Sequence, residues 1–83
     1  NTYKSIKDII IKNIYSILSD IYYCNLLEVN KRKNYQRKII VNIKMLDFYF
    51  NQLYLYKVIT KDHYNNISSN LVIILKLIYG WMK

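Results

Sequence analysis

Proline and glycine are nearly missing from this sequence of 83 residues, which has no proline and a single glycine. Tight turns between strands depend on these residues, because glycine supplies positive φ angles and proline fixes φ at the first turn position. Hydrophobic residues, in contrast, make up 53% of the chain and are mostly Ile, Leu and Tyr. The composition therefore predicts an all-α protein, and the length leaves room for one domain with a modest core.

Side chains that support catalysis or hold metals are also scarce, since the chain has one cysteine, one histidine and five acidic residues. A lone cysteine excludes an internal disulfide, and the apolar neighbours of Cys24 predict a buried thiol. Cys24 and His63 together fall short of the four ligands of a structural zinc site, and no glycine-rich phosphate loop is present. We expect no enzymatic activity, metal, cofactor or small-molecule substrate.

Long uncharged apolar runs are missing as well. The two longest apolar stretches, 39–56 and 71–82, are interrupted by polar and charged residues, so neither supplies the ~20 residues that span a bilayer. The first residues do not have the pattern of a signal peptide. Because the chain begins with Asn1 and not with Met, we expect it to be processed or to lack an upstream segment.

Positive charge is abundant, with 13 Lys and Arg against five acidic residues and a formal net charge of +8. Such a balance favours a polyanionic partner, with nucleic acid first and an anionic membrane surface second. The abundance of Ile, Asn, Lys and Tyr is also typical of an AT-rich genome, so part of the lysine content reflects composition alone.

Apolar residues recur at three- and four-residue intervals in three segments, the spacing of one helical face. These segments predict helices over about 3–29, 34–57 and 61–82, in a single domain over 1–83. The polar stretch 30–38 predicts the first turn, while an alternative turn at Asn25 would shorten the first helix and lengthen the second. Thr60 is a suitable N-cap for the third helix, and the connection of about three residues before it predicts an antiparallel arrangement. The expected fold is an up-down antiparallel helical bundle.

The predicted core follows one apolar line on each helix. Its members are Ile6, Ile10, Ile14, Ile17 and Ile21, then Ile39, Ile43, Leu46, Phe50 and Leu53, and finally Tyr64, Ile67, Leu71, Ile74 and Ile78. The third segment is apolar on nearly all sides. Two neighbouring helices cannot bury that much apolar surface. We therefore expect a fourth helix, another subunit or a partner protein. The residues assigned to subunit contacts are Val41, Phe48, Leu55, Ile73, Leu77 and Trp81.

A cluster of cations marks the first turn, where Lys31, Arg32, Lys33, Arg37 and Lys38 follow one another closely. An up-down-up bundle brings the end of the third helix, with Trp81 and Lys83, to the same end of the molecule. These six cations are the predicted phosphate contacts, because a cation cluster gives affinity for nucleic acid without reading bases. The alternative interpretation is a solvated loop in a lysine-rich protein.

The stretch from Leu46 onward is similar to the end of the accessory variability determinant (Avd) proteins of diversity-generating retroelements. The shared features are a Leu-Asp pair, a Lys-x-x-Tyr helix opening and a Gly-Trp-Met-Lys ending. The matching residues here are Leu46, Asp47, Lys61, Tyr64, Ser68, Leu71, Ile74, Lys76, Gly80, Trp81, Met82 and Lys83. The resemblance covers 35–83 well and the first helix only by pattern, and Leu75 and Tyr79 stand where the family usually has glycine.

The resemblance implies a four-helix bundle that assembles as a basic homopentamer in the cytoplasm of a bacterium or archaeon, or is encoded by a phage. It further implies a non-enzymatic protein that binds the retroelement's reverse transcriptase and its template RNA to support mutagenic cDNA synthesis. Helical bundles encoded in intervening sequences of ribosomal RNA share the same plan and are the nearest rival family. A different class of function also remains open, a structural module whose apolar face docks a protein and which has no role with RNA or DNA.

Overall fold

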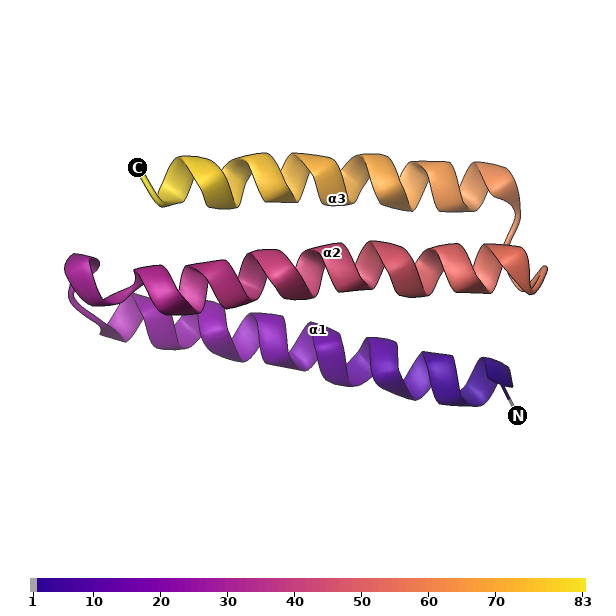
Figure 1. Cartoon of the computed structure of the whole chain (residues 1–83), viewed down its shortest axis with the longest axis horizontal. Coiled ribbons are helices and arrows are strands. Elements are labelled where there is room, and N and C mark those ends of the chain that lie inside the picture. Colours follow the sequence, from indigo (N-terminus) through magenta and orange to yellow (C-terminus); the bar gives the residue numbers. More distant parts are fainter. Residues whose placement is uncertain (1) are drawn as a thin grey trace.

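The computed structural model describes residues 2–83 and contains three long α-helices in an up-down-up order (Figure 1). They are α1 (Thr2–Leu26), α2 (Lys33–Leu55) and α3 (Lys61–Trp81), with a single 3₁₀ turn, η1 (Val29–Lys31), between α1 and α2. The prediction of an all-α antiparallel bundle is thereby confirmed, with three helices in the described part of the chain.

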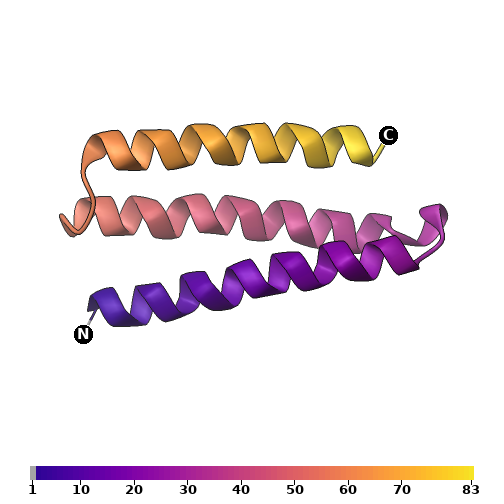
Figure 2. The same ribbon diagram turned by 180° about the vertical axis from the view of Figure 1, so that it is seen from behind.

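The three helices lie side by side in one layer, with α2 between α1 and α3, as the front and back views both show (Figures 1 and 2). α2 packs against both neighbours, whereas α1 and α3 share few contacts at most. The layer measures 43 × 23 × 13 Å. Its smallest dimension is well below the other two, as expected where the outer helices pack on the middle one and hardly on each other. Its Cα radius of gyration is 14.1 Å, against about 12 Å for a compact domain of this length.

The buried core follows the predicted apolar lines, and it is densest along α2. Ile39, Ile43 and Cys24 are the most deeply buried side chains, and Ile10, Leu71 and Ile78 join them from the outer helices. Two predicted core residues are instead exposed, Ile14 on α1 and Ile74 on α3. Both were assigned to the core on helical spacing alone, and the flat arrangement leaves their side of the outer helices without a neighbour.

α1 ends at Leu26, three residues before the predicted boundary at 29. The chain turns at Leu27, whose N–H donates to the Cys24 carbonyl, and Glu28 then takes an extended conformation with φ −60° and ψ 148°. The first helix is thus shorter, as the alternative turn at Asn25 expected. α2 nevertheless begins at Lys33, close to the main prediction, because η1 and Arg32 occupy the intervening residues.

The connection between α2 and α3 is longer than the predicted three residues, because α2 ends at Leu55 rather than at 57. Lys57 adopts a left-handed conformation with φ 62°. Its N–H donates to the Tyr54 carbonyl and the next N–H, of Val58, donates to the Leu53 carbonyl, which is the Schellman pattern of helix termination. Thr60 then caps α3 as predicted, with its hydroxyl accepting from the His63 N–H at 3.2 Å.

α2 and α3 are also joined by a polar contact between two residues of the family resemblance. The Tyr64 hydroxyl donates to both carboxylate oxygens of Asp47, at 3.2 and 3.1 Å. Burial and the negative charge of Asp47 raise the pKa of Tyr64, and a hydrogen bond with Ser68 offsets part of this rise. The contact fixes the register of α3 against α2 at the end of the molecule opposite the cation cluster.

Candidate nucleic-acid interface

One end of the layer is where α1 ends, α2 begins and α3 ends, and the predicted cations gather there. Lys31 lies in η1, Arg32 and Lys33 at the start of α2, and Arg37 and Lys38 in its second turn. Lys83 follows the end of α3, and it lines the same cleft as Lys33. The structure therefore brings Lys83 and Trp81 to the cation cluster, as the up-down-up order predicted. We call this group the cationic end.

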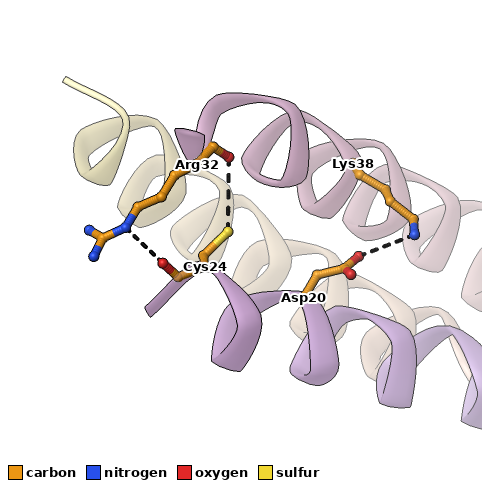
Figure 3. A network of polar contacts seen from close by, with 4 residues as sticks. All are labelled: Asp20, Cys24, Arg32 and Lys38. Atoms are coloured by element: carbon orange, nitrogen blue, oxygen red, sulfur yellow. Dashed lines mark hydrogen bonds and ion pairs between the residues drawn. The ribbon is translucent and has the colours of Figure 1, made fainter. Parts of the chain in front are cut away.

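Arg32 has a structural role that the sequence did not reveal. Its Nε donates to the carbonyl oxygens of Cys24, at 2.8 Å, and of Leu27, at 3.1 Å (Figure 3 shows the first of these). These carbonyls belong to the end of α1, where the last turn of a helix leaves oxygens without intrahelical partners. A cation there also complements the negative end of the helix dipole. Arg32 thus ties the start of α2 to the end of α1, while its two terminal nitrogens point away from Cys24.

Lys38 is also engaged within the molecule. Its Nζ lies 3.7 Å from Oδ2 of Asp20, an ion pair between α2 and α1 (Figure 3). The lysine side chain is 59% exposed and the aspartate side chain 12%. An exposed lysine in such a pair contributes little stability. Lys38 nevertheless lies beside a negative charge, which weakens the field it presents to a phosphate.

Four cations of the cationic end remain exposed, and their side chains make no ion pair or hydrogen bond among the described residues: Lys31, Lys33, Arg37 and Lys83. Acidic residues are few nearby, with Glu28 exposed in the same turn and Asp20 already paired. Such side chains can reach phosphates as point charges, or in a planar fork in the case of Arg37. The cationic end is chemically suited to a polyanion.

A cleft of about 360 Å³ opens at the cationic end, between the start of α2 and the end of α3. Its lining includes Arg32, Lys33, Gln36, Trp81 and Lys83. Trp81 packs partly against the core, and in this it differs from the other residues assigned to subunit contacts. The sequence analysis missed Gln36, which is buried at 4% exposure. A signal was available, because Gln36 precedes Ile39 by three residues and Ile43 by seven and so shares their helical face.

The other five residues assigned to subunit contacts are exposed. Phe48 is 50% exposed and Leu77 is 67% exposed, and the exposed fractions of Val41, Leu55 and Ile73 lie between these two values. Val41, Phe48 and Leu55 are seven residues apart and share one side of α2. That side is opposite the buried Ile43, since two residues correspond to about 200° around a helix.

A second apolar feature crosses all three helices. A groove of about 180 Å³ is lined by apolar side chains alone, including Ile14 and Leu18 of α1, Leu46 of α2, and Leu71 and Ile74 of α3. It contains the two exposed residues that the sequence placed in the core. Because Ile43 also lines it, the groove and the Val41–Phe48 side lie on opposite faces of the layer. Both faces of the layer therefore present apolar surface.

Cys24 is a free thiol with 0% exposure, as predicted. Burial and the nearby charge of Asp20 raise the pKa of the Cys24 thiol, with a smaller opposing effect of Arg32. His63 is exposed at the start of α3, at the end of the layer opposite Cys24. Within the described residues, no three His, Cys, Asp or Glu side chains come together in a way that could hold a metal ion.

Comparisons with protein-family models, curated proteins and solved structures find no match to this chain. None of the helices formed by residues 2–83 combines the length and the apolar character needed to cross a membrane.

Proposed function

We propose that this protein is a non-enzymatic, basic RNA-binding subunit that associates with copies of itself. The observation that carries the proposal is the cationic end, where four exposed cations have side chains without intramolecular partners. Two of them, Lys33 and Lys83, line a cleft that contains the single Trp of the chain. Phosphate contacts by such residues give affinity and orientation and carry no sequence information by themselves. DNA is the second polyanion that this chemistry accommodates.

The self-association in this proposal is supported by surface area. The chain exposes 6091 Å², about 800 Å² more than the roughly 5,300 Å² expected for a folded monomer of this mass. A standard protein–protein interface buries about 800 Å² on each partner. The surplus is thus of the size that one partner would cover, and both faces of the layer offer apolar side chains for the contact. Val41, Phe48, Leu55, Ile73 and Leu77 remain the proposed contact residues.

The cellular role that we propose is that of an accessory subunit of a retroelement reverse transcriptase. In this role the protein binds the enzyme and its template RNA, assembles as a homopentamer and supports mutagenic cDNA synthesis. This part rests on the resemblance of 35–83 to the accessory variability determinant proteins, whose Gly-Trp-Met-Lys ending is its most specific feature. A helical bundle of the kind encoded in ribosomal RNA intervening sequences is the alternative within the same plan.

The RNA-binding proposal is tested by measuring the affinity for a labelled single-stranded RNA by fluorescence anisotropy over a range of salt concentrations. Four phosphate contacts give a log–log salt slope of about −2.8, so affinity falls about 50-fold between roughly 50 and 200 mM salt. Changing Lys31, Lys33 and Arg37 to Gln leaves about one contact, a slope of about −0.7 and a threefold loss over the same range. Arg32 and Lys38 are left unchanged because both make contacts within the fold.

The matched control is a second triple variant that removes the same charge from the opposite end of the layer, with Lys7, Lys57 and Lys61 changed to Gln. All three are exposed. We expect this control to bind RNA with the slope of the parent protein. Equal loss in both triple variants would show that net charge, and not the cationic end, determines RNA binding.

A second candidate function is a protein-interaction module without a role with nucleic acid, and the apolar groove across α1, α2 and α3 favours it. Heparin and RNA separate the two functions. An RNA-binding subunit is retained on heparin and is released by RNA at physiological salt, whereas a protein-interaction module with solubilising lysines binds neither.

A further inference from the structure

The cleft at the cationic end contains a largely buried glutamine whose side chain has no hydrogen-bond partner among the described residues. Gln36 is 4% exposed and lines the cleft, and its side-chain amide makes no hydrogen bond to any described residue. The amide nitrogen and oxygen of Gln36 are not among the fully enclosed polar atoms of the described residues, so they remain open to the cleft and within reach of a group that enters it. A ligand in the cleft that both donates and accepts hydrogen bonds would satisfy the amide.

The same cleft holds positive charge and an aromatic ring. Lys33 and Lys83 line it from α2 and from the end of α3, and Trp81 lines it while packing partly against the core. The start of α2 contributes in addition, because no side chain caps it and the N–H groups of its first turn form the positive end of the helix dipole. Aromatic rings beside cations are how proteins hold successive bases of a single strand.

We propose that this cleft binds one nucleotide unit of a single-stranded RNA. The base stacks on Trp81, the amide of Gln36 hydrogen-bonds to the edge of the base, and Lys33 and Lys83 contact the phosphate. The volume of about 360 Å³ lies in the range of sites that hold small organic ligands. This inference rests on the proposed RNA binding and adds a defined contact to it, so Trp81 acts in RNA binding rather than in subunit contacts.

Trp81 provides the direct test, because it is the only Trp of the chain. Its fluorescence, excited at wavelengths where tyrosine absorbs little, is followed while a short single-stranded oligonucleotide, a nucleoside monophosphate or inorganic phosphate is added. We expect saturable quenching by the oligonucleotide and, at higher concentration, by the monophosphate, with no quenching by phosphate. Equal quenching by phosphate would overturn the nucleotide site, since an anion alone would then account for the signal.

Anisotropy of the labelled oligonucleotide, measured on the same samples, separates this inference from the proposed function. Binding seen by anisotropy without a change in Trp81 fluorescence would overturn the cleft and leave RNA binding at the cationic end intact. Absence of binding by both measurements would overturn the proposed function as well.

Variants of Gln36 distinguish a ligand contact from a structural role. Gln36→Leu keeps a similar volume and removes the amide, and we expect about tenfold weaker oligonucleotide binding with unchanged or higher thermal stability. The control is Gln52→Leu, a half-buried glutamine of the same helix outside the cleft, which we expect to bind as the parent does. Lower stability with unchanged affinity in Gln36→Leu would contradict the inference. Trp81→Leu is expected to weaken binding about tenfold in the anisotropy measurement, in line with the usual effect of removing a stacking ring.

Discussion

Replacing Arg32 tests whether this residue holds the cationic end together or serves mainly as one more surface charge. Arg32→Gln removes the Nε donor to the Cys24 and Leu27 carbonyls, at 2.8 and 3.1 Å. Hydrogen bonds to charged groups contribute about 1.5–3 kcal/mol, and because Arg32 is half-buried we expect a loss of about 2 kcal/mol. For a domain of this size such a loss lowers Tm by roughly 8–16 °C.

Lys33→Gln is the matched control, because it removes the same charge from the next residue, which is exposed and whose side chain makes no ion pair or hydrogen bond among the described residues. We expect its free energy of unfolding to stay within about 0.5 kcal/mol of the parent value. Both variants are followed by circular dichroism at one fixed protein concentration, since self-association makes Tm depend on concentration. If Arg32→Gln is as stable as Lys33→Gln, the attachment of α2 to the end of α1 through Arg32 is refuted.

Three further outcomes follow from the helix ends and from the buried thiol. Lys57→Gly should raise the free energy of unfolding by about 0.5–1 kcal/mol, because glycine tolerates the left-handed conformation that Lys57 adopts at φ 62°. Lys57→Ala keeps the strain and should not stabilise the protein. Urea titrations of the two variants measure the difference. Thr60→Ala should cost about 1 kcal/mol through loss of the cap on α3, and Thr60→Ser should recover most of it. The raised pKa of Cys24 means that the thiol ionises at lower pH in the unfolded chain than in the folded one. The stability contributed by the protonated Cys24 thiol is therefore complete below about pH 8.5 and is lost as pH rises. Between roughly pH 8 and 10, the range around the ordinary thiol pKa, the free energy of unfolding should therefore fall more in the parent than in Cys24→Ala. Equal decreases in the two proteins would contradict this reasoning.

Helical periodicity and composition were sufficient to predict the number, type and order of the three helices. The start of α3 was predicted to the residue, because Thr60 is a strong local signal that acts within one turn. The end of α2 was misplaced by two residues, since a left-handed lysine is an uncommon device that no sequence pattern indicates. Ile14 and Ile74 show the limit of periodicity, which identifies the apolar side of a helix and does not say whether a neighbour covers it.

The candidate site was predictable as a cluster of charges and not as an arrangement. Lys31, Lys33 and Arg37 lie exposed, as a run of cations in a polar turn suggests. The contacts of Arg32 and Lys38 depend on where α1 ends and on the register of α1 against α2, which are properties of the packed structure. The cleft depends likewise on the return of α3 to the first turn. The residues that line the cleft come from 29–36 and from 81–83, two segments more than forty positions apart in the chain.

The mass of the protein in solution, measured by light scattering with and without single-stranded RNA from the neighbouring locus, tests the proposed role most directly. The proposed role predicts an assembly of about five chains of 10.1 kDa, a number that rests on the resemblance of 35–83 to the accessory variability determinant proteins. Its mass should increase when RNA is added, because the cationic end remains available for phosphate contacts. A monomer whose mass does not change with RNA would contradict both the self-association and the RNA binding.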